Sequence, residues 1–265
     1  MKITVIGAGN MGGALARGWA KSDKMNVADI TVADKSEAVL AQFKKEFPMI
    51  NTTSDNVAAV KDAEIVVVAV KPWLVETVVG SIKDAVDYKR QIVVSIAANV
   101  LIERLTELFA KADGSVPALF YTIPNIAAEF GASMSFVASA KDNSEEARNK
   151  VYDLFRIVGD VLPCEERLVG PGMMMASCGI AYVMRYIRAQ MEGGVEMGFY
   201  PKEALAIALQ TMQGAINLLR ETGLHPEAAI DKVTTPGGTT IKGLNELDHA
   251  GFSSAVIRSL KAGLK

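Results

Sequence analysis

Two glycine-rich segments, one near each end of the 265-residue chain, have the composition of loops that bind anions. The later segment, residues 233–240, reads Val-Thr-Thr-Pro-Gly-Gly-Thr-Thr and continues into a helical pattern at residues 241–248. Glycine lets the backbone turn its N–H groups toward a ligand, and a helix start adds partial positive charge, so this segment can hold a small anion. A helix start that is simply capped by threonine is the alternative interpretation.

The earlier segment reads Gly-Ala-Gly-Asn-Met-Gly at residues 7–12 and lies between an apolar run at 3–6 and a helical pattern at 11–21. In this setting the first glycine allows a tight turn, the second lets a pyrophosphate approach the backbone, and the third lets helix and strand pack closely. The pattern predicts that a dinucleotide binds at this turn. The expected cofactor contacts are Gly7, Gly9, Asn10, Met11 and Gly12.

Asp34 follows the second apolar run, 22 residues after Gly12. An acidic side chain in this place can bond the hydroxyls of an adenosine ribose, which favours NADH. Lys35 and Ser36 come next and can accept a 2′-phosphate, so we expect NADPH to be tolerated. An aspartate that only forms a turn is the alternative.

Further polar and turn residues follow later strands of the predicted sheet. Because the carboxyl ends of parallel strands form the edge where ligands bind in open α/β sheets, we expect these residues to line a cofactor cleft. Asn125 is expected to orient the nicotinamide amide or the substrate, with a plain turn asparagine as the alternative. The expected cofactor contacts at this edge are Val70, Lys71, Pro72 and Ala97, and Lys71 is alternatively a solvated strand end.

The order of apolar runs predicts a doubly wound, Rossmann-type α/β domain at residues 1–165, followed by an all-helical substrate and dimerisation domain at 166–265. A helix after residue 138 is expected to be capped by Asn143, because Glu146 lies three residues later. The predicted strands are residues 3–6, 30–33, 65–70, 92–96, 119–122, 133–138 and 161–163. The predicted helices of the second domain are residues 172–196, 201–222, 226–232, 239–249 and 252–263.

The helical pattern at 201–222 is apolar on two faces. A domain of about 100 residues has difficulty surrounding such a helix alone, so the pattern predicts a homodimer, or a larger homo-oligomer built of dimers. One face comprises Leu205, Ala208, Leu209, Met212, Ile216 and Leu219, and the other comprises Ala204, Ile207, Ala215 and Leu218.

Composition excludes several classes of partner. The net charge of −2 offers no basic surplus for nucleic acid. The longest apolar run, residues 65–70, is far shorter than the ~20 residues of a membrane helix, and the start of the chain lacks the pattern of a secretory signal, so a cytoplasmic protein is expected. The two cysteines, Cys164 and Cys178, and the two isolated histidines lack metal-ligand spacing, so no metal is expected.

Taken in order along the chain, several segments resemble those of the pyrroline-5-carboxylate reductase family. This family reduces the cyclic imine 1-pyrroline-5-carboxylate to proline with NAD(P)H, in the last step of proline synthesis. The resemblance implies a cyclic imino acid as substrate, with a carboxylate that the backbone of the later loop would bind. The segments are residues 9–12, 69–72, 123–125, 193–195, 208–211, 225–226 and 235–240, and the implied substrate contacts are Pro236, Gly237, Gly238, Thr239 and Asn125, with Thr240 as the hydroxyl donor to the imine nitrogen.

The chain departs from the family pattern in two segments. Tyr121 stands where the family usually has arginine, Ile123 replaces a methionine, and Ile126-Ala127 replaces Thr-Pro, while residues 176–181 replace a Ser-Gly-Ser-Gly-Pro-Ala run. These differences leave open a related imine as substrate, or a nucleotide-sensing protein without catalysis. The β-hydroxyacid dehydrogenases also have a Rossmann domain followed by helices, but they use a lysine on the long helix after the domain boundary. Residues 172–197 contain no lysine, so this class of enzyme is disfavoured.

Overall fold

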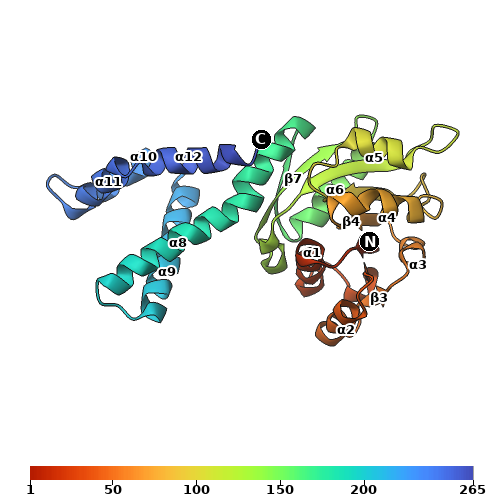
Figure 1. Ribbon diagram of the computed structural model, residues 1–265, viewed down its shortest axis with the longest axis horizontal. Helices are drawn as coiled ribbons and strands as arrows, with labels where there is room; N and C mark the ends of the chain where they lie inside the picture. Colours follow the sequence, from red (N-terminus) through yellow and green to blue (C-terminus); the bar gives the residue numbers. More distant parts are fainter. Residues whose placement is uncertain (265) are drawn as a thin grey trace. The chain divides into compact units, whose positions relative to one another are not determined.

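The computed structural model describes residues 1–264 and divides into two compact units, one of residues 1–178 and one that begins at Gly179 (Figure 1). The first unit carries the sheet and the second is helical.

Within the described residues, eight strands form one sheet in the order β3-β2-β1-β4-β5-β6-β7-β8. The first six are mutually parallel, as predicted, whereas β7 runs antiparallel to β6, and β8 runs parallel to β7. The strands are β1 (Ile3–Ile6), β2 (Ile30–Ala33), β3 (Asn51–Thr53), β4 (Ile65–Val68), β5 (Ile92–Ser95), β6 (Ala118–Ile123), β7 (Ser133–Ser139) and β8 (Gly159–Pro163).

The central strands are apolar along their whole length because helices cover both faces of the sheet. All four residues of β1, of β4 and of β5 are buried. One apolar core packs side chains of α1, α2 and α6 on the sheet, and the other packs side chains of α3, α4 and α5 on it. The helical segments are α1 (Asn10–Lys21), η1 (Val27–Asp29), α2 (Glu37–Glu46), α3 (Asn56–Val60), η2 (Pro72–Leu74), α4 (Val75–Ile82), α5 (Ile102–Phe109), η3 (Ile126–Phe130), α6 (Glu145–Arg156), η4 (Glu166–Leu168), α7 (Val169–Gly172) and the π-helical η5 (Met173–Cys178).

Two local expectations were wrong. Strand β3 was not predicted, because its sequence Asn-Thr-Thr is short, polar and only partly covered at the sheet edge. The cap of α6 is Ser144, whose Oγ accepts from the Ala147 N–H at 3.1 Å. Asn143 instead donates from Nδ2 to the Leu119 carbonyl at 2.7 Å, so its amide ties the preceding turn to β6.

The segment after β8 belongs to the first unit. Helix α7 and the π segment η5 contact β7, and Gly172 fits so closely that a Cβ there would lie 2.5 Å from the Phe136 ring. By packing, the chain divides after Cys178, and the expected domain boundary between residues 165 and 166 stays a prediction. The pattern expected as one helix over 172–196 is a π segment followed by α8 (Gly179–Glu196).

The described part of the second unit is all-helical, as predicted. Helix α8 packs on α9 (Pro201–Thr222), where Gly194 faces Ala204 closely enough that a Cβ would lie 3.0 Å from the alanine methyl. Helix α9 ends at Gly223, whose φ of +62° is a left-handed stop. The remaining helices are α10 (Pro226–Val233), α11 (Thr239–His249) and α12 (Phe252–Ala262). Among the described helices, none is both long enough and apolar enough to cross a bilayer.

We expect Gly18→Ala to destabilise the first unit. A Cβ at Gly18 would lie 2.1 Å from the Ala128 carbonyl oxygen, so α1 and η3 would have to move apart, at a loss of about 1–3 kcal/mol in the free energy of unfolding. Gly80 of α4 is the control: it is exposed, and no described atom outside its own helical turn lies within 4 Å of its Cβ position, so Gly80→Ala should gain about 0.5–1 kcal/mol. Urea denaturation measures both variants, and equal effects would contradict this account.

Candidate active site

The turn between β1 and α1 has the geometry that a dinucleotide-binding loop requires. Gly7 has a φ of +94°, and a Cβ there would lie 2.8 Å from the Ala69 carbonyl oxygen. At Gly12 a Cβ would lie 2.0 Å from the Gly7 oxygen, so α1 can approach β1 only with glycine in this place. Around Gly9, no described atom other than those of the residue itself and its chain neighbours lies within 4 Å of the Cβ position. The backbone at Gly9 is therefore open to a pyrophosphate, which fits the predicted cofactor.

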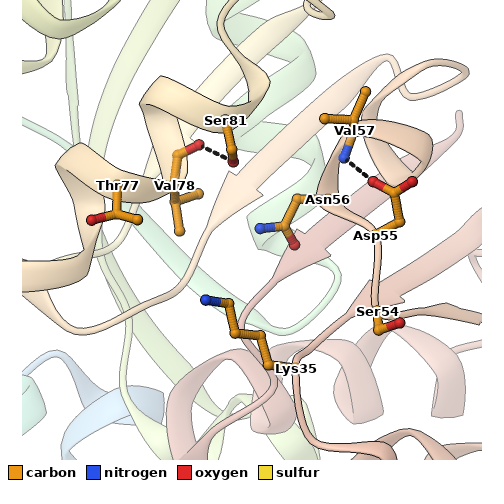
Figure 2. A pocket seen from close by; sticks show the side chains of 8 residues that line it. All are labelled: Lys35, Ser54, Asp55, Asn56, Val57, Thr77, Val78 and Ser81. Carbon is orange, nitrogen blue, oxygen red and sulfur yellow. Dashed lines mark hydrogen bonds between the residues drawn. The ribbon is translucent and has the colours of Figure 1, made fainter.

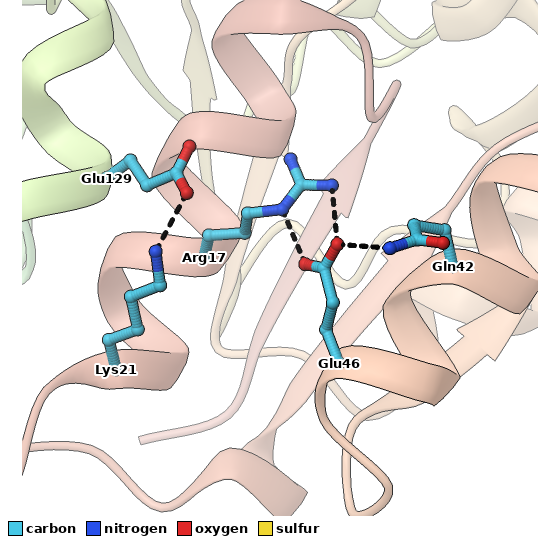
Figure 3. Close-up of polar contacts among 5 residues, drawn as sticks. All are labelled: Arg17, Lys21, Gln42, Glu46 and Glu129. Atoms are coloured by element: carbon cyan, nitrogen blue, oxygen red, sulfur yellow. Dashed lines mark hydrogen bonds and ion pairs between the residues drawn. The ribbon is translucent and has the colours of Figure 1, made fainter.

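Helix α1, which begins at this loop, is fixed to its neighbours by polar contacts on its flank (Figure 3). Arg17 pairs with Glu46 of α2 through Nε and Oε2 at 2.6 Å, and Gln42 donates to the same carboxylate at 2.7 Å. The hydrogen bond from Arg17 lowers the pKa of Glu46, so this pair persists at neutral pH. One turn further along α1, Lys21 pairs with Glu129 of η3 at 2.7 Å.

Trp19 supplies a buried anchor for the same helix. Its indole Nε1 donates to the Leu154 carbonyl of α6 at 2.9 Å, and its ring meets Phe155 edge to face with centroids 5.7 Å apart. With these contacts in place, the loop at the start of α1 has a rigid support.

The register of the central strands brings the predicted cofactor segments to one edge of the sheet. Ile6 pairs with Val68, Val68 with Ser95, and Ser95 with Tyr121, so the chain leaves β1, β4, β5 and β6 at the same carboxyl edge. The structure thereby places the glycine loop, residues 69–72, Ala97 and Asn125 along one line. Their contacts with a ligand stay predictions.

Asp34 joins the end of β2 to the glycine loop. Its Oδ2 accepts from the Ala8 N–H at 2.7 Å, and its Oδ1 accepts from the Ser36 N–H at 2.8 Å. Both carboxylate oxygens thus stabilise the local backbone, as the turn interpretation requires. Each oxygen keeps a second lone pair, so the side chain retains the capacity to accept from a ribose hydroxyl.

A cavity of about 390 Å³ lies beyond Asp34, between the loop after β2 and helices α3 and α4 (Figure 2). Lys35 extends into it from that loop, and Asn56 faces it from the first turn of α3. Asp55 caps this helix by accepting from the Val57 N–H at 2.8 Å. The cavity is lined by Lys35, Ser54, Asp55, Asn56, Val57, Thr77, Val78 and Ser81.

Sequence reasoning identified Lys35 but missed the other residues of this cavity. The missed signal is the Ser-Asp-Asn run at 54–56, a helix-capping pattern directly after the short polar strand β3. Because β3 itself was not recognised, the start of α3 could not be placed at the carboxyl edge of the sheet.

The Asn125 side chain stabilises a local turn, which was the alternative to a role in ligand binding. Its side chain is buried, and Oδ1 accepts from the Ala127 N–H at 3.0 Å, which caps η3. Its Nδ2 faces the Ala176 carbonyl of the π segment at 3.5 Å. The amide therefore links η3 to η5, and an additional contact with nicotinamide or substrate stays a prediction.

In the second unit, the loop before α11 is a tight turn that needs its glycines. The Gly238 N–H donates to the Thr235 carbonyl at 2.9 Å, and Gly237 has a φ of +71° after Pro236, the features of a type II turn. Gly238 then precedes the first helical residue, Thr239. Its N–H closes the turn, and a contact of Gly238 with the substrate carboxylate stays a prediction.

The helix start that follows this loop is exposed and offers backbone donors. Thr239 and Thr240 are both exposed in the first turn of α11, where the backbone N–H groups have no partner within the helix. Thr240 also presents a hydroxyl group from the same turn.

Comparisons with known proteins agree with both units. Residues 166–265 match the family model described as pyrroline-5-carboxylate reductase dimerisation, and residues 2–99 match the one described as NADP oxidoreductase, coenzyme F420-dependent. The chain is similar to solved pyrroline carboxylate reductases of Plasmodium falciparum, with NADP bound, and of Coxiella burnetii. Both structures have a TM-score of 0.88, at 24% and 25% identity, over 99% of this chain and 95% of theirs.

Curated relatives are similar over almost the whole chain. The pyrroline-5-carboxylate reductase of Methanosarcina acetivorans is 32% identical over 97% of this chain and 95% of its own length, and that of Aquifex aeolicus is 34% identical over 98% and 94%. Pyrroline-5-carboxylate reductase 1 of Dictyostelium discoideum is 35% identical over 97% of this chain, which spans about half (48%) of that relative. The chain therefore belongs to the pyrroline-5-carboxylate reductase family.

Proposed function

We propose that this protein reduces 1-pyrroline-5-carboxylate to L-proline with NAD(P)H. The observation that carries the proposal is the joint presence of a dinucleotide loop whose first and third glycines, Gly7 and Gly12, are sterically required and a Thr-Pro-Gly-Gly-Thr-Thr turn that opens α11. The similarity to named reductases over more than nine-tenths of their length supports the same reaction.

The reaction does not require a strong acid or base from the protein. When bound, the reduced nicotinamide supplies a hydride to the imine carbon, and one proton from solution gives the amine of proline. The residues of this chain have to orient the two reactants and stabilise charge. The glycine loop and the edge segments after β4 and β5 would hold the cofactor.

The turn before α11 would hold the substrate. The N–H groups of Thr239 and Thr240 at the helix start suit the substrate carboxylate, since a helix N-terminus combines unpaired donors with a partial positive charge. The Thr240 hydroxyl would orient the imine nitrogen. Pro236 and Gly237 give the turn its shape.

We also propose that the protein acts as a homodimer through its second unit. Several large apolar side chains of α9 are 39–49% exposed in the single chain, whereas Ala204 and Ala208 are buried against neighbouring helices. A helix that is apolar on the side its own unit leaves open requires another surface to cover it. The exposed side chains are Leu205, Ile207, Leu209, Ile216 and Leu218.

A cytoplasmic location, a larger assembly of dimers, and a preference for NADH over NADPH stay predictions. Lys35 and Asn56, which face one cavity beside Asp34, support the use of NADPH as well.

Thr240→Val is expected to lower kcat/KM for pyrroline-5-carboxylate at least ~10-fold, which corresponds to one lost hydrogen bond in the transition state. The assay is NADH or NADPH oxidation on addition of the substrate. Thr222→Val is the matched control, because the Thr222 hydroxyl makes only local hydrogen bonds at the end of α9: it donates to the Leu218 carbonyl at 2.6 Å and accepts from the Leu224 N–H at 3.3 Å. If the Thr240→Val variant keeps the wild-type kcat/KM, the hydroxyl does not have the proposed role. If the wild type reduces no cyclic imine, the proposed function is wrong.

Substitutions at Asp34 and Lys35 should shift cofactor choice in opposite directions. Asp34→Asn removes a negative charge that repels a 2′-phosphate but keeps an acceptor for the Ala8 N–H, so the ratio of kcat/KM for NADPH over NADH should rise about tenfold. Lys35→Ala removes a cation from the cavity and should lower the same ratio by a similar factor. If both variants leave this ratio of kcat/KM values unchanged, Asp34 and Lys35 do not discriminate between NADPH and NADH.

Leu209→Arg should dissociate the dimer, because it buries an unpaired charge in the predicted interface. Sedimentation velocity at micromolar concentration is expected to show dimers for the wild type and monomers for the variant. Met49→Arg, at a 68% exposed position of the first unit, should remain dimeric. A monomeric wild type would contradict the proposed assembly.

A further inference from the structure

The loop between β5 and α5, residues 96–101, contains an unusual backbone conformation at the predicted cofactor edge. Asn99 has a φ of +63°, the one positive φ outside glycine among the described residues. The left-handed region is less favourable than the ordinary regions even for asparagine, so contacts from the surrounding structure have to hold it. The Asn99 side chain is exposed, so these contacts must act on its backbone.

Tyr121 of β6 supplies such a contact. Its phenol oxygen accepts a hydrogen bond from the Asn99 N–H at 3.0 Å. The ring is 2% exposed and belongs to a small apolar cluster against which Ala98 and Ile102 of the same region pack. Burial raises the pKa of the Tyr121 phenol, so the side chain stays neutral at physiological pH.

A second contact fixes the far end of the loop. The Ile102 N–H, at the start of α5, donates to Oε1 of Glu166 at 2.6 Å. Between these two anchors the chain has little freedom, and before them lies Ala97, whose backbone follows β5 at the carboxyl edge of the sheet. Residues 97–100 form one turn, closed by the Val100 N–H on the Ala97 carbonyl at 3.3 Å, so the conformation of Asn99 affects how residues 97 and 98 present their peptide groups at this edge.

We propose that Tyr121 is a positioning residue for the cofactor, which acts by holding Asn99 in the left-handed conformation and thereby setting the β5–α5 loop. The inference rests on the proposed function as an NAD(P)H enzyme. Without the phenol oxygen, Asn99 can relax to a negative φ, which reorients the peptide group between Ala98 and Asn99. Only the fraction of molecules with the correct loop then binds the cofactor well, so the apparent affinity falls.

Tyr121→Phe removes the hydrogen bond and keeps the ring. Isothermal titration with NADPH and NADH is expected to show Kd values about tenfold higher than for the wild type, on the order of one lost hydrogen bond. Tyr88→Phe is the matched control, because the Tyr88 hydroxyl donates to the Phe109 carbonyl at 2.6 Å at the opposite end of α5. Both variants should melt at a lower temperature, but the Tyr88 variant should keep the wild-type Kd, which separates positioning from general stability.

Asn99→Gly tests the mechanism, since glycine adopts a positive φ about as readily as a negative one. In the Asn99→Gly background, Tyr121→Phe should raise the Kd only about threefold instead of about tenfold. An unchanged Kd for Tyr121→Phe, or an equal effect in both backgrounds, would overturn the inference.

The same titrations separate this inference from the proposed function. A wild type that binds neither nucleotide would overturn both. A wild type that binds them but reduces no cyclic imine would overturn only the proposed function, and the Kd comparison would still decide the role of Tyr121.

Discussion

The close approach of α1 to the turn after β1 is the constraint on which the first unit depends. The Gly7 carbonyl oxygen occupies the space that a side chain at residue 12 would need, so the helix can start here only because glycine stands at that position. Asp34 ties the loop to β2, and Trp19 together with the Arg17–Glu46 pair holds the helix behind it. The parallel register of β1, β4, β5 and β6 then brings three more segments to the same edge. A rigid cofactor platform follows from these contacts.

The second unit also depends on a glycine-containing turn at the start of a helix. A type II turn, which requires a positive φ at Gly237, brings the chain sharply into α11 and leaves Thr239 and Thr240 exposed at the helix start. The apolar side chains of α9 are also exposed in the single chain. This uncovered apolar face favours an assembly in which a partner chain covers the helices.

Much of this architecture was predictable because its signals are local. The buried runs of β1, β4 and β5 are purely apolar, and the glycine spacing at 7–12 has one structural meaning between a strand and a helix. The antiparallel turn into β7 was not predictable, since strand direction depends on which neighbour a strand pairs with. The cavity beside Lys35 was missed because β3 is polar and short. The uses of Asn125 and Gly238 depend on distant or turn-closing hydrogen bonds, to Ala176 and Thr235, that residue type alone does not reveal.

The central claim is that both glycine-rich loops serve one hydride transfer to a cyclic imine. Isotope transfer from nicotinamide to product tests it most directly. The protein is incubated with pyrroline-5-carboxylate and NADPH or NADH fully deuterated at C4, and the product is analysed by mass spectrometry and NMR. The account predicts proline with one deuterium on the carbon that was the imine carbon. Proline without deuterium there, or no proline with either cofactor, would contradict it.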